Sequence, residues 1–438
     1  MSDKKIGFLQ ATALVTGNMI GSGIFLLPTS LAVFGYFSLW GWLISTIGAI
    51  LLATVFARLS RLMPITGGPY AYTQQAFGKT TGFFVAWGYW ICVWTGNAAI
   101  VIAFVSNLSP FFPILGKSPV IAAICSIITV WLLTWLNIRG VQKAARFQLI
   151  TTIFKLLPIL LIGTVGFLYF KPENFFIRPL DLKFPDVFFE TAALTLWSFL
   201  GIESATIPAA HIRNPEKNIP RATITGTLIS AVVFVLSCTA VIGILPHHII
   251  INSASPFSDA ANAMWGQTFY YVIAATAAIA CLGTLNGWIL LQGQVAWAAA
   301  NEKVFPPFFL RTTKNQTPIS GLIVSSVLTT LLIFFNYSAT LQQQFQNMIL
   351  LSTLSTLIPY AFCSVAELII LKKRGIAITW RNHKQLIFIS AFALIFSIGA
   401  IIGTGPKTIL YGLLLLALGL PFYFWGYRKS LSIEELTK

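Results

Sequence analysis

Long apolar stretches separated by short polar connections run along the whole of this 438-residue chain. An α-helix needs about 20 predominantly apolar residues to cross the ~30 Å hydrocarbon core of a bilayer. The pattern therefore predicts an all-α, polytopic membrane protein with a single transmembrane domain over residues 1–438. The twelve predicted spans are roughly 8–33, 38–60, 81–110, 119–138, 147–170, 185–210, 222–245, 268–298, 318–336, 344–371, 385–404 and 407–427.

Glycine-containing segments interrupt the first and the sixth of these spans. They read Gly17-Asn18-Met19-Ile20-Gly21-Ser22-Gly23-Ile24-Phe25 and Trp197-Ser198-Phe199-Leu200-Gly201-Ile202-Glu203-Ser204-Ala205. A helix break in lipid strands backbone N–H and C=O groups at several kcal/mol each, unless they line a polar cavity. Two breaks at corresponding positions of two halves indicate the substrate site of a secondary transporter. We predict halves at about 8–170 and 185–371, with helices eleven and twelve (about 385–427) outside the repeat.

The segment Gly21-Ser22-Gly23 has the composition of an anion site. Glycines allow backbone amides to converge on a ligand, and the half-helix that follows presents N–H groups and a positive dipole end to a carboxylate. The alternative is that these small residues only allow close packing between helices.

Composition and charge agree with a membrane protein. Hydrophobic residues make up 56% of the chain and charged residues only 9%, against roughly 25% charged in a soluble protein. The formal net charge is +16, but most Lys and Arg fall in alternate connections, as the positive-inside rule describes. This pattern predicts a cytoplasmic-membrane protein with both termini in the cytoplasm, and it gives no reason to expect a nucleic-acid partner.

Among the ionisable residues within predicted spans, three stand out, because charges there are expensive and usually functional. Glu203 follows the break in span six, so we expect proton-linked or gating chemistry there, against the alternative of a neutral packing residue. Glu367 in span ten has a simpler explanation, pairing with Lys372 or Lys373 near the cytoplasmic end. Lys155 is a candidate coupling cation that bridges helices; alternatively, its side chain reaches the interface.

Aromatic residues cluster near the breaks and could hold a cationic side chain through the ring quadrupole. Trp197 lies at the break in span six, Trp288 in span eight, and Tyr89 in span three with Asn97 two turns later. Each alone could be a packing residue. The sequence contains no nucleotide-binding, zinc-protease or serine-hydrolase motif, so we expect neither an enzyme nor a primary pump, and no cofactor or metal.

Taken in order, these motifs resemble the amino acid–polyamine–organocation superfamily. Within it, the chain most resembles the arginine/agmatine antiporters of the basic amino acid/polyamine antiporter family, over about residues 5–430. The matching motifs are Gly17-Asn18 with Gly21-Ser22-Gly23, Gly67-Gly68 with Tyr70-Ala71-Tyr72, Leu196-Trp197-Ser198-Phe199, Glu203-Ser204-Ala205, Ser253-Ala254-Ser255-Pro256-Phe257, Gly287-Trp288 and Pro359-Tyr360.

The resemblance implies a fold and a set of roles. The fold would be the five-plus-five inverted repeat (LeuT-like) with broken helices 1 and 6 and two extra C-terminal helices, often in a homodimer. The implied substrate-binding residues are Asn18, Met19, Ser22, Gly23, Cys92, Asn97, Trp197, Leu200, Trp288 and Ser352. Among them, Ser22 and Gly23 would bind the carboxylate, and Trp288 would stack on the guanidinium. Tyr89, Glu203 and Tyr360 would form an outer, pH-responsive gate.

The implied function is exchange of a basic amino acid, most favourably arginine, for its decarboxylated amine or another amino acid. Cys92 and Val93 depart from the Ala and Cys of the arginine/agmatine antiporters, so the distal pocket is left open. Lys155 resembles the proton-coupled amino acid symporters instead, and the ornithine/putrescine exchangers share many of the motifs. Proton symport and ornithine/putrescine exchange are therefore the alternatives.

Overall fold

The computed structural model is described over residues 7–65, 67–139, 158–177, 184–206, 209, 212–313 and 317–424, without the side chains of Ser22 and residues 184–186. These ranges are helical apart from short connections and one isolated β-bridge, Thr312 to Pro318. The elements are α1 (Phe8–Met19), η1 (Ser22–Phe25), α2 (Leu27–Ala32), η2 (Gly35–Phe37), α3 (Ser38–Leu62), α4 (Pro69–Phe77), α5 (Lys79–Leu108), α6 (Ile114–Lys117), α7 (Pro119–Ile138), η3 (Gly166–Tyr169), α9 (Pro172–Phe175), α10 (Phe184–Leu196), η4 (Trp197–Phe199), η5 (Ile202–Ala205), α11 (Pro215–Ile244), α12 (His247–Ile250), α13 (Pro256–Trp265), α14 (Gln267–Asn301), η7 (Pro307–Leu310), α15 (Ile319–Asn336), α16 (Leu341–Lys373), α17 (Trp380–Gly403) and α18 (Pro406–Ala417).

Within the described residues, nine helices are long and apolar enough to cross a bilayer, judged by length and composition. They correspond to nine of the twelve predicted spans. The first and sixth predicted spans are divided into shorter helices, and the fifth is described only from residue 158, where an apolar helix covers Pro158–Tyr169. The chain is therefore a multi-pass membrane protein, while the count of twelve spans and the inverted repeat stay predictions.

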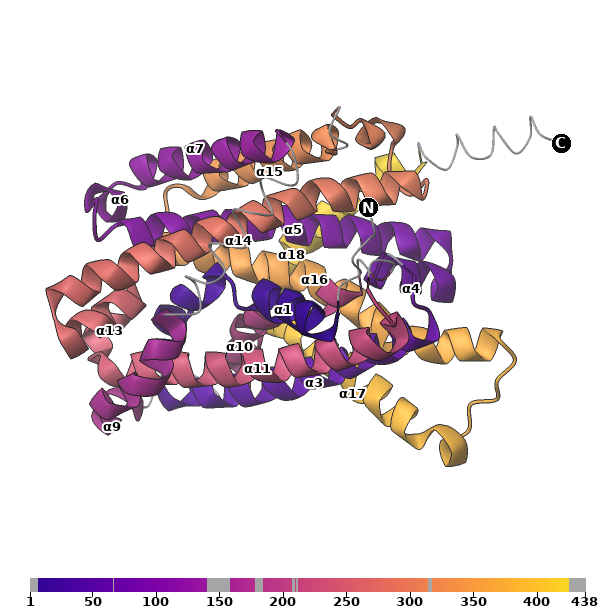
Figure 1. The fold of residues 1–438 in the computed structure, drawn as a ribbon, viewed down its shortest axis with the longest axis horizontal. Helices are drawn as coiled ribbons and strands as arrows, with labels where there is room; N and C mark the ends of the chain where they lie inside the picture. Colours follow the sequence, from indigo (N-terminus) through magenta and orange to yellow (C-terminus); the bar gives the residue numbers. More distant parts are fainter. Residues whose placement is uncertain are drawn as a thin grey trace.

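The long helices run side by side along the longest dimension of the molecule (Figure 1). Helices α7 and α15 pack together at one edge, α5 packs against α14 and α16, and α3 packs against α11 and α10 on the other side. Helix α1 lies between these two groups and contacts α11 and η5. Met19 and Ile20 at the end of α1 are buried, so the surrounding helices shield the first break from lipid.

Helix α5 forms the centre of the bundle. Its most apolar window is 89% buried inside the protein, against 11% for the helix over Pro406–Phe424. A helix that is apolar all round belongs either in a protein core or in lipid. Helix α5 is therefore the core helix against which site residues from other elements can pack, and the helix over 406–424 has the surface of a lipid-facing element.

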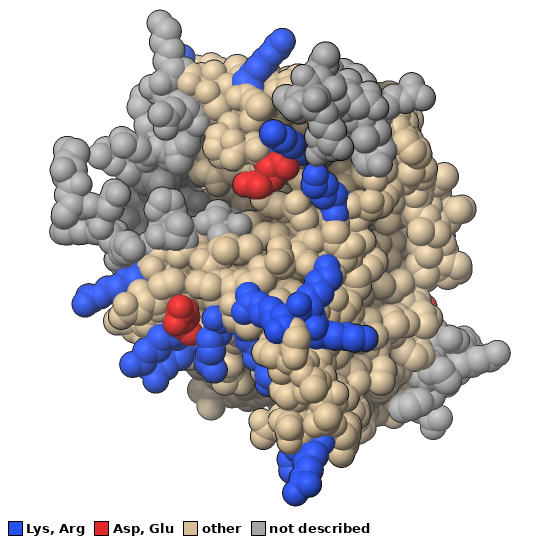
Figure 2. All heavy atoms as spheres, turned by 90° about the vertical axis from the view of Figure 1, so that its right-hand side faces the viewer, with Lys and Arg blue, Asp and Glu red and all other residues tan. Residues whose placement is uncertain are grey.

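One end of the bundle is strongly basic. Figure 2 looks onto the end that contains α4 and the connection between α16 and α17, and Lys and Arg there far outnumber Asp and Glu. The helix ends in this region carry the exposed residues Arg61, Lys79, Lys372, Lys373, Arg374, Arg381 and Lys384. By the positive-inside rule this end would face the cytoplasm, which is the predicted orientation.

Candidate substrate site

The first helix break lies at Ile20 and Gly21. Helix α1 ends at Met19, Ile20 has the non-helical angles φ −74° and ψ 79°, and Gly21 is extended at φ −110°. The chain then enters η1 and, from Leu27, the short helix α2. Backbone groups at such an interruption leave the regular helical hydrogen-bond ladder and become available to a ligand.

The second break lies at Leu200 and Gly201, between η4 and η5. Leu200 is extended at ψ 135°, and Gly201 has φ +103°, a left-handed conformation that favours glycine. A Cβ at Gly201 would lie 3.3 Å from Cβ of Asn18, so the two breaks approach each other closely. Asn18 Nδ2 also donates a hydrogen bond of 2.9 Å to Ser204 Oγ and ties them together.

A small cavity lies between the two breaks. Its volume is about 20 Å³, and it is lined by Asn18, Met19, Gly21, Gly23, Ile24, Ile100, Trp197, Ser198, Leu200, Thr284 and Trp288. Such a volume holds roughly one water molecule. The cavity in this form is therefore too small for a ligand of amino-acid size.

Trp197 and Gly23 bring the two broken helices into contact. An added Cβ at Gly23 would overlap the Trp197 indole, so that ring packs directly on the glycine backbone. Trp197 is only 7% exposed and Trp288 8%. Both tryptophans line the cavity, together with residues from both breaks.

Cys92 and Ser352 lie next to this cavity but do not line it. Ser352 Oγ donates to the Cys92 carbonyl at 2.8 Å, and Thr356 Oγ1 lies 2.6 Å from the Cys92 sulfur. Both contacts join α5 to α16. Gly96 lies between Ser352 and the two cavity tryptophans. An added Cβ at Gly96 would lie 3.2 Å from Ser352 Oγ, 3.3 Å from the Trp197 ring and 3.7 Å from the Trp288 ring.

The Glu203 carboxyl group accepts hydrogen bonds from two tyrosine hydroxyls that belong to different helices. Tyr89 of α5 donates to Oε1 at 2.7 Å, and Tyr360 of α16 donates to Oε2. Glu203 is 1% exposed. A buried carboxyl group must be hydrogen-bonded to be tolerated, and the two tyrosines meet that need. The structure therefore brings the three predicted gating residues into one cluster, while their gating role stays a prediction.

Comparison with known families identifies the chain. The family model described as amino acid permease matches residues 6–409. The chain belongs to the amino acid permease family. It is therefore a membrane transporter and not an enzyme.

Curated relatives of this permease match it over nearly the full length. The putrescine transporter PotE of Haemophilus influenzae is 33% identical over 431 residues, 98% of each chain. The cadaverine/lysine antiporter of Escherichia coli is 34% identical over 448 residues, 100% of this chain and 98% of the relative. The Escherichia coli PotE is 31% identical over 423 residues, 96% and 95% of the two chains. The predicted superfamily is confirmed, whereas these relatives are not arginine/agmatine antiporters.

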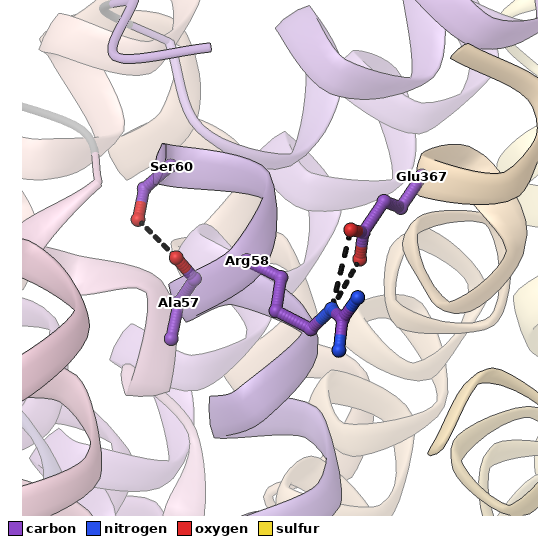
Figure 3. Close-up of polar contacts among 4 residues, drawn as sticks. All are labelled: Ala57, Arg58, Ser60 and Glu367. Atoms are coloured by element: carbon purple, nitrogen blue, oxygen red, sulfur yellow. Dashed lines mark hydrogen bonds and ion pairs between the residues drawn. The ribbon is translucent and has the colours of Figure 1, made fainter. Parts of the chain in front are cut away.

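At the basic end of the permease, Glu367 pairs with Arg58 and not with the predicted Lys372 or Lys373. Arg58 Nε lies 2.9 Å from Glu367 Oε2 and 3.2 Å from Oε1, an ion pair between α3 and α16 (Figure 3). The predicted partners are five and six residues further along α16, on other faces of a helix with 3.6 residues per turn. Lys373 Nζ instead donates to the Gln75 carbonyl of α4 at 3.2 Å.

Asn97 and Lys155 are the two remaining predicted residues. Asn97 does not line the cavity; its Nδ2 donates to Gln292 Oε1 on α14 at 2.7 Å. Lys155 lies outside the described residues.

The sequence predictions missed several residues at the site. Ile24, Ile100, Ser198 and Thr284 line the cavity, and Gly96 and Gln292 lie beside it. A usable signal existed for Gln292, because it is a polar residue one helical turn after Trp288 in a predicted span.

Proposed function

We propose that this permease exchanges a basic amino acid for the amine formed by its decarboxylation. The observation that carries the proposal is the cavity where backbone from two helix breaks meets the Trp197 and Trp288 indoles. Broken-helix backbone suits the carboxylate and α-amino group of an amino acid, and indole faces attract a cationic side chain. Relatives named as a putrescine transporter and a cadaverine/lysine antiporter support the same pairing of substrates.

The proposal includes a role for most of the predicted substrate-binding residues. Ser22 and Gly23 would bind the carboxylate, and the carbonyls of Met19, Trp197 and Leu200 the α-amino group. Trp288 would cover the cationic end, with Cys92, Asn97 and Ser352 around it. Alternating access by rocking of helices would expose the site to each side in turn. In that cycle, the occluded form would resemble the small cavity described above.

The amine partner and the basic amino acid are proposed as matched pairs. Arginine with agmatine was the pair implied by the sequence resemblance. The names of the relatives favour putrescine, the amine of the ornithine/putrescine alternative, or lysine with cadaverine. In each pair the amine lacks only the carboxylate, so one cavity can serve both molecules.

The first experiment measures uptake of labelled arginine, ornithine and lysine into proteoliposomes. The vesicles are loaded with agmatine, putrescine, cadaverine, the amino acid itself or buffer. We expect uptake only into loaded vesicles, with the best internal partner identifying the pair. Uptake into empty vesicles under an imposed pH gradient would overturn exchange, favour proton symport and direct attention to Lys155.

Removing the Trp288 indole tests the stacking role. We expect Trp288→Ala to weaken binding of the basic amino acid by at least about tenfold, because it removes the aromatic face next to the cationic end. Trp288→Phe keeps an aromatic face and should largely preserve binding. Apparent affinities come from inhibition of exchange by unlabelled substrate. Equal losses in the two variants would contradict stacking.

A further inference from the structure

One polar atom of the Asn97 side chain makes no hydrogen bond within the described part of the protein. The residue is fully buried, and its Oδ1 has no hydrogen-bond partner within the described part of the chain. A buried acceptor without a partner is destabilising, so such an atom needs an explanation. The other end of the same amide is bound, since Nδ2 donates to Gln292 Oε1 at 2.7 Å.

Main-chain carbonyls determine which way the Gln292 amide points. Gln292 Nε2 donates to the Leu322 carbonyl at 3.3 Å and to Ser326 Oγ at 2.9 Å. A carbonyl oxygen can only accept, so the amino end of Gln292 must face α15. Its Oε1 must then face Asn97.

The hydrogen bonds beyond Gln292 agree with this orientation of its amide. Thr134 Oγ1 donates to the Val130 carbonyl at 2.7 Å, so its hydrogen is already used. At the 2.7 Å contact between Ser326 and Thr134, the Ser326 hydroxyl is therefore the donor. That leaves Ser326 Oγ to accept from Gln292, in agreement with the direction set by the Leu322 carbonyl.

It follows that Asn97 cannot turn its amide over without a penalty. A reversed amide would place Oδ1 against Gln292 Oε1, two acceptors at hydrogen-bond distance. Gln292 cannot compensate by turning as well, because its own oxygen would then face the Leu322 carbonyl. Residues on α14, α15 and α7 thus hold the Asn97 oxygen in the unpaired position.

The segment of α5 that carries Asn97 lies beside the two cavity indoles. Asn97 directly follows Gly96, whose added Cβ would touch both Trp197 and Trp288. Gln292 comes one turn after Trp288 on α14. An unpaired acceptor carried by a segment that packs on aromatic faces is suited to a donor with positive charge.

We propose that Gln292 is a positioning residue for substrate selection. It keeps the Asn97 oxygen available as the acceptor for the ammonium or guanidinium at the distal end of the substrate. The inference rests on the proposed function and deepens it, because it names the group that distinguishes a cationic substrate from an uncharged one of equal length.

The test compares ligands that differ only at the distal end. Lysine is compared with norleucine, and cadaverine with n-pentylamine, as inhibitors of exchange by the full-length permease in proteoliposomes. We expect Gln292→Met to reduce the preference for the charged ligand by about tenfold, through a higher inhibition constant for lysine and cadaverine. The constants for norleucine and n-pentylamine and the maximal exchange rate should stay within about twofold, since only distal binding is lost.

A matched control separates this role from general damage. Gln344 on α16 is also buried, and its Nε2 donates to the Ala339 carbonyl at 2.8 Å. Gln344→Met removes a comparable amide away from Asn97 and should leave the preference unchanged. If Gln292→Met does not reach the membrane, Gln292→Asn serves instead, because it is one methylene too short to reach α15 and Asn97 together.

A double-mutant cycle decides whether Gln292 acts through Asn97. In an Asn97→Ala background, adding Gln292→Met should cause no further loss of preference. An unchanged preference in Gln292→Met, or an equal further loss in the Asn97→Ala background, would overturn the inference. If the wild-type protein exchanges neither lysine nor cadaverine nor any other pair in the panel, the proposed function itself fails.

Discussion

Gly23→Ala is expected to abolish exchange while leaving the protein folded in the membrane. A methyl group at this position would overlap the Trp197 indole, which packs on the glycine backbone where the two broken helices meet. A side chain added to a well-packed site forces its neighbours into strained positions. The Trp197 ring would have to move away, so the closed form of the cavity could not be reached.

Exchange in proteoliposomes and the melting temperature of purified protein measure the two effects separately. We expect a loss of exchange of about hundredfold or more with little change in melting temperature. Gly88→Ala is the matched control, because Gly88 lies within the buried helix α5 and its added Cβ would meet neighbours at an ordinary 3.4–3.5 Å. Normal exchange by Gly23→Ala would show that the contact between Gly23 and Trp197 is not needed in the transport cycle.

Replacing Glu203 should have the second large effect. Glu203→Ala removes the shared acceptor of Tyr89 and Tyr360 and leaves two phenol hydroxyls in a buried region. Each buried hydroxyl without a partner costs about 1–3 kcal/mol. Because these bonds join η5 to α5 and α16, we expect exchange to fall by about hundredfold, together with a lower melting temperature.

Graded variants distinguish loss of the acceptor from loss of volume. Glu203→Gln keeps the shape and one carbonyl acceptor, so its exchange rate should lie between those of the wild type and Glu203→Ala. Tyr89→Phe and Tyr360→Phe each remove one bond and should reduce exchange less than Glu203→Ala. Wild-type exchange by the variant that combines both phenylalanine substitutions would contradict a role for this cluster in transport.

Much of the fold could be predicted because membrane helices follow local rules. Length and apolarity determine whether a segment can span the bilayer, and nine predicted spans correspond to long apolar helices in the structure. The break near Gly21 was also predictable, since glycine and polar side chains within an apolar stretch weaken a helix. The first and sixth predicted spans do not appear as single long helices, because each is divided into shorter helices.

The residues that line the cavity were predictable only in part. Residues next to the breaks, such as Met19, Gly23 and Leu200, line it because their position along the chain already places them there. Cys92, Asn97 and Ser352 come from other helices and bind neighbouring side chains or backbone instead. Whether they face a cavity depends on the rotation and depth of α5 and α16, which sequence spacing does not determine.

The sequence by itself determined the class of the protein, most of its membrane helices and the two chain segments where the substrate site should be sought. These properties depend on apolar length, charge and glycine content within short stretches. Only the tertiary structure decided that Glu367 meets Arg58, that Glu203 joins Tyr89 to Tyr360, and that Asn97 donates a hydrogen bond to Gln292. In these contacts the paired residues are more than 100 positions apart, so they form only when helix packing sets the orientation of each helix about its own axis.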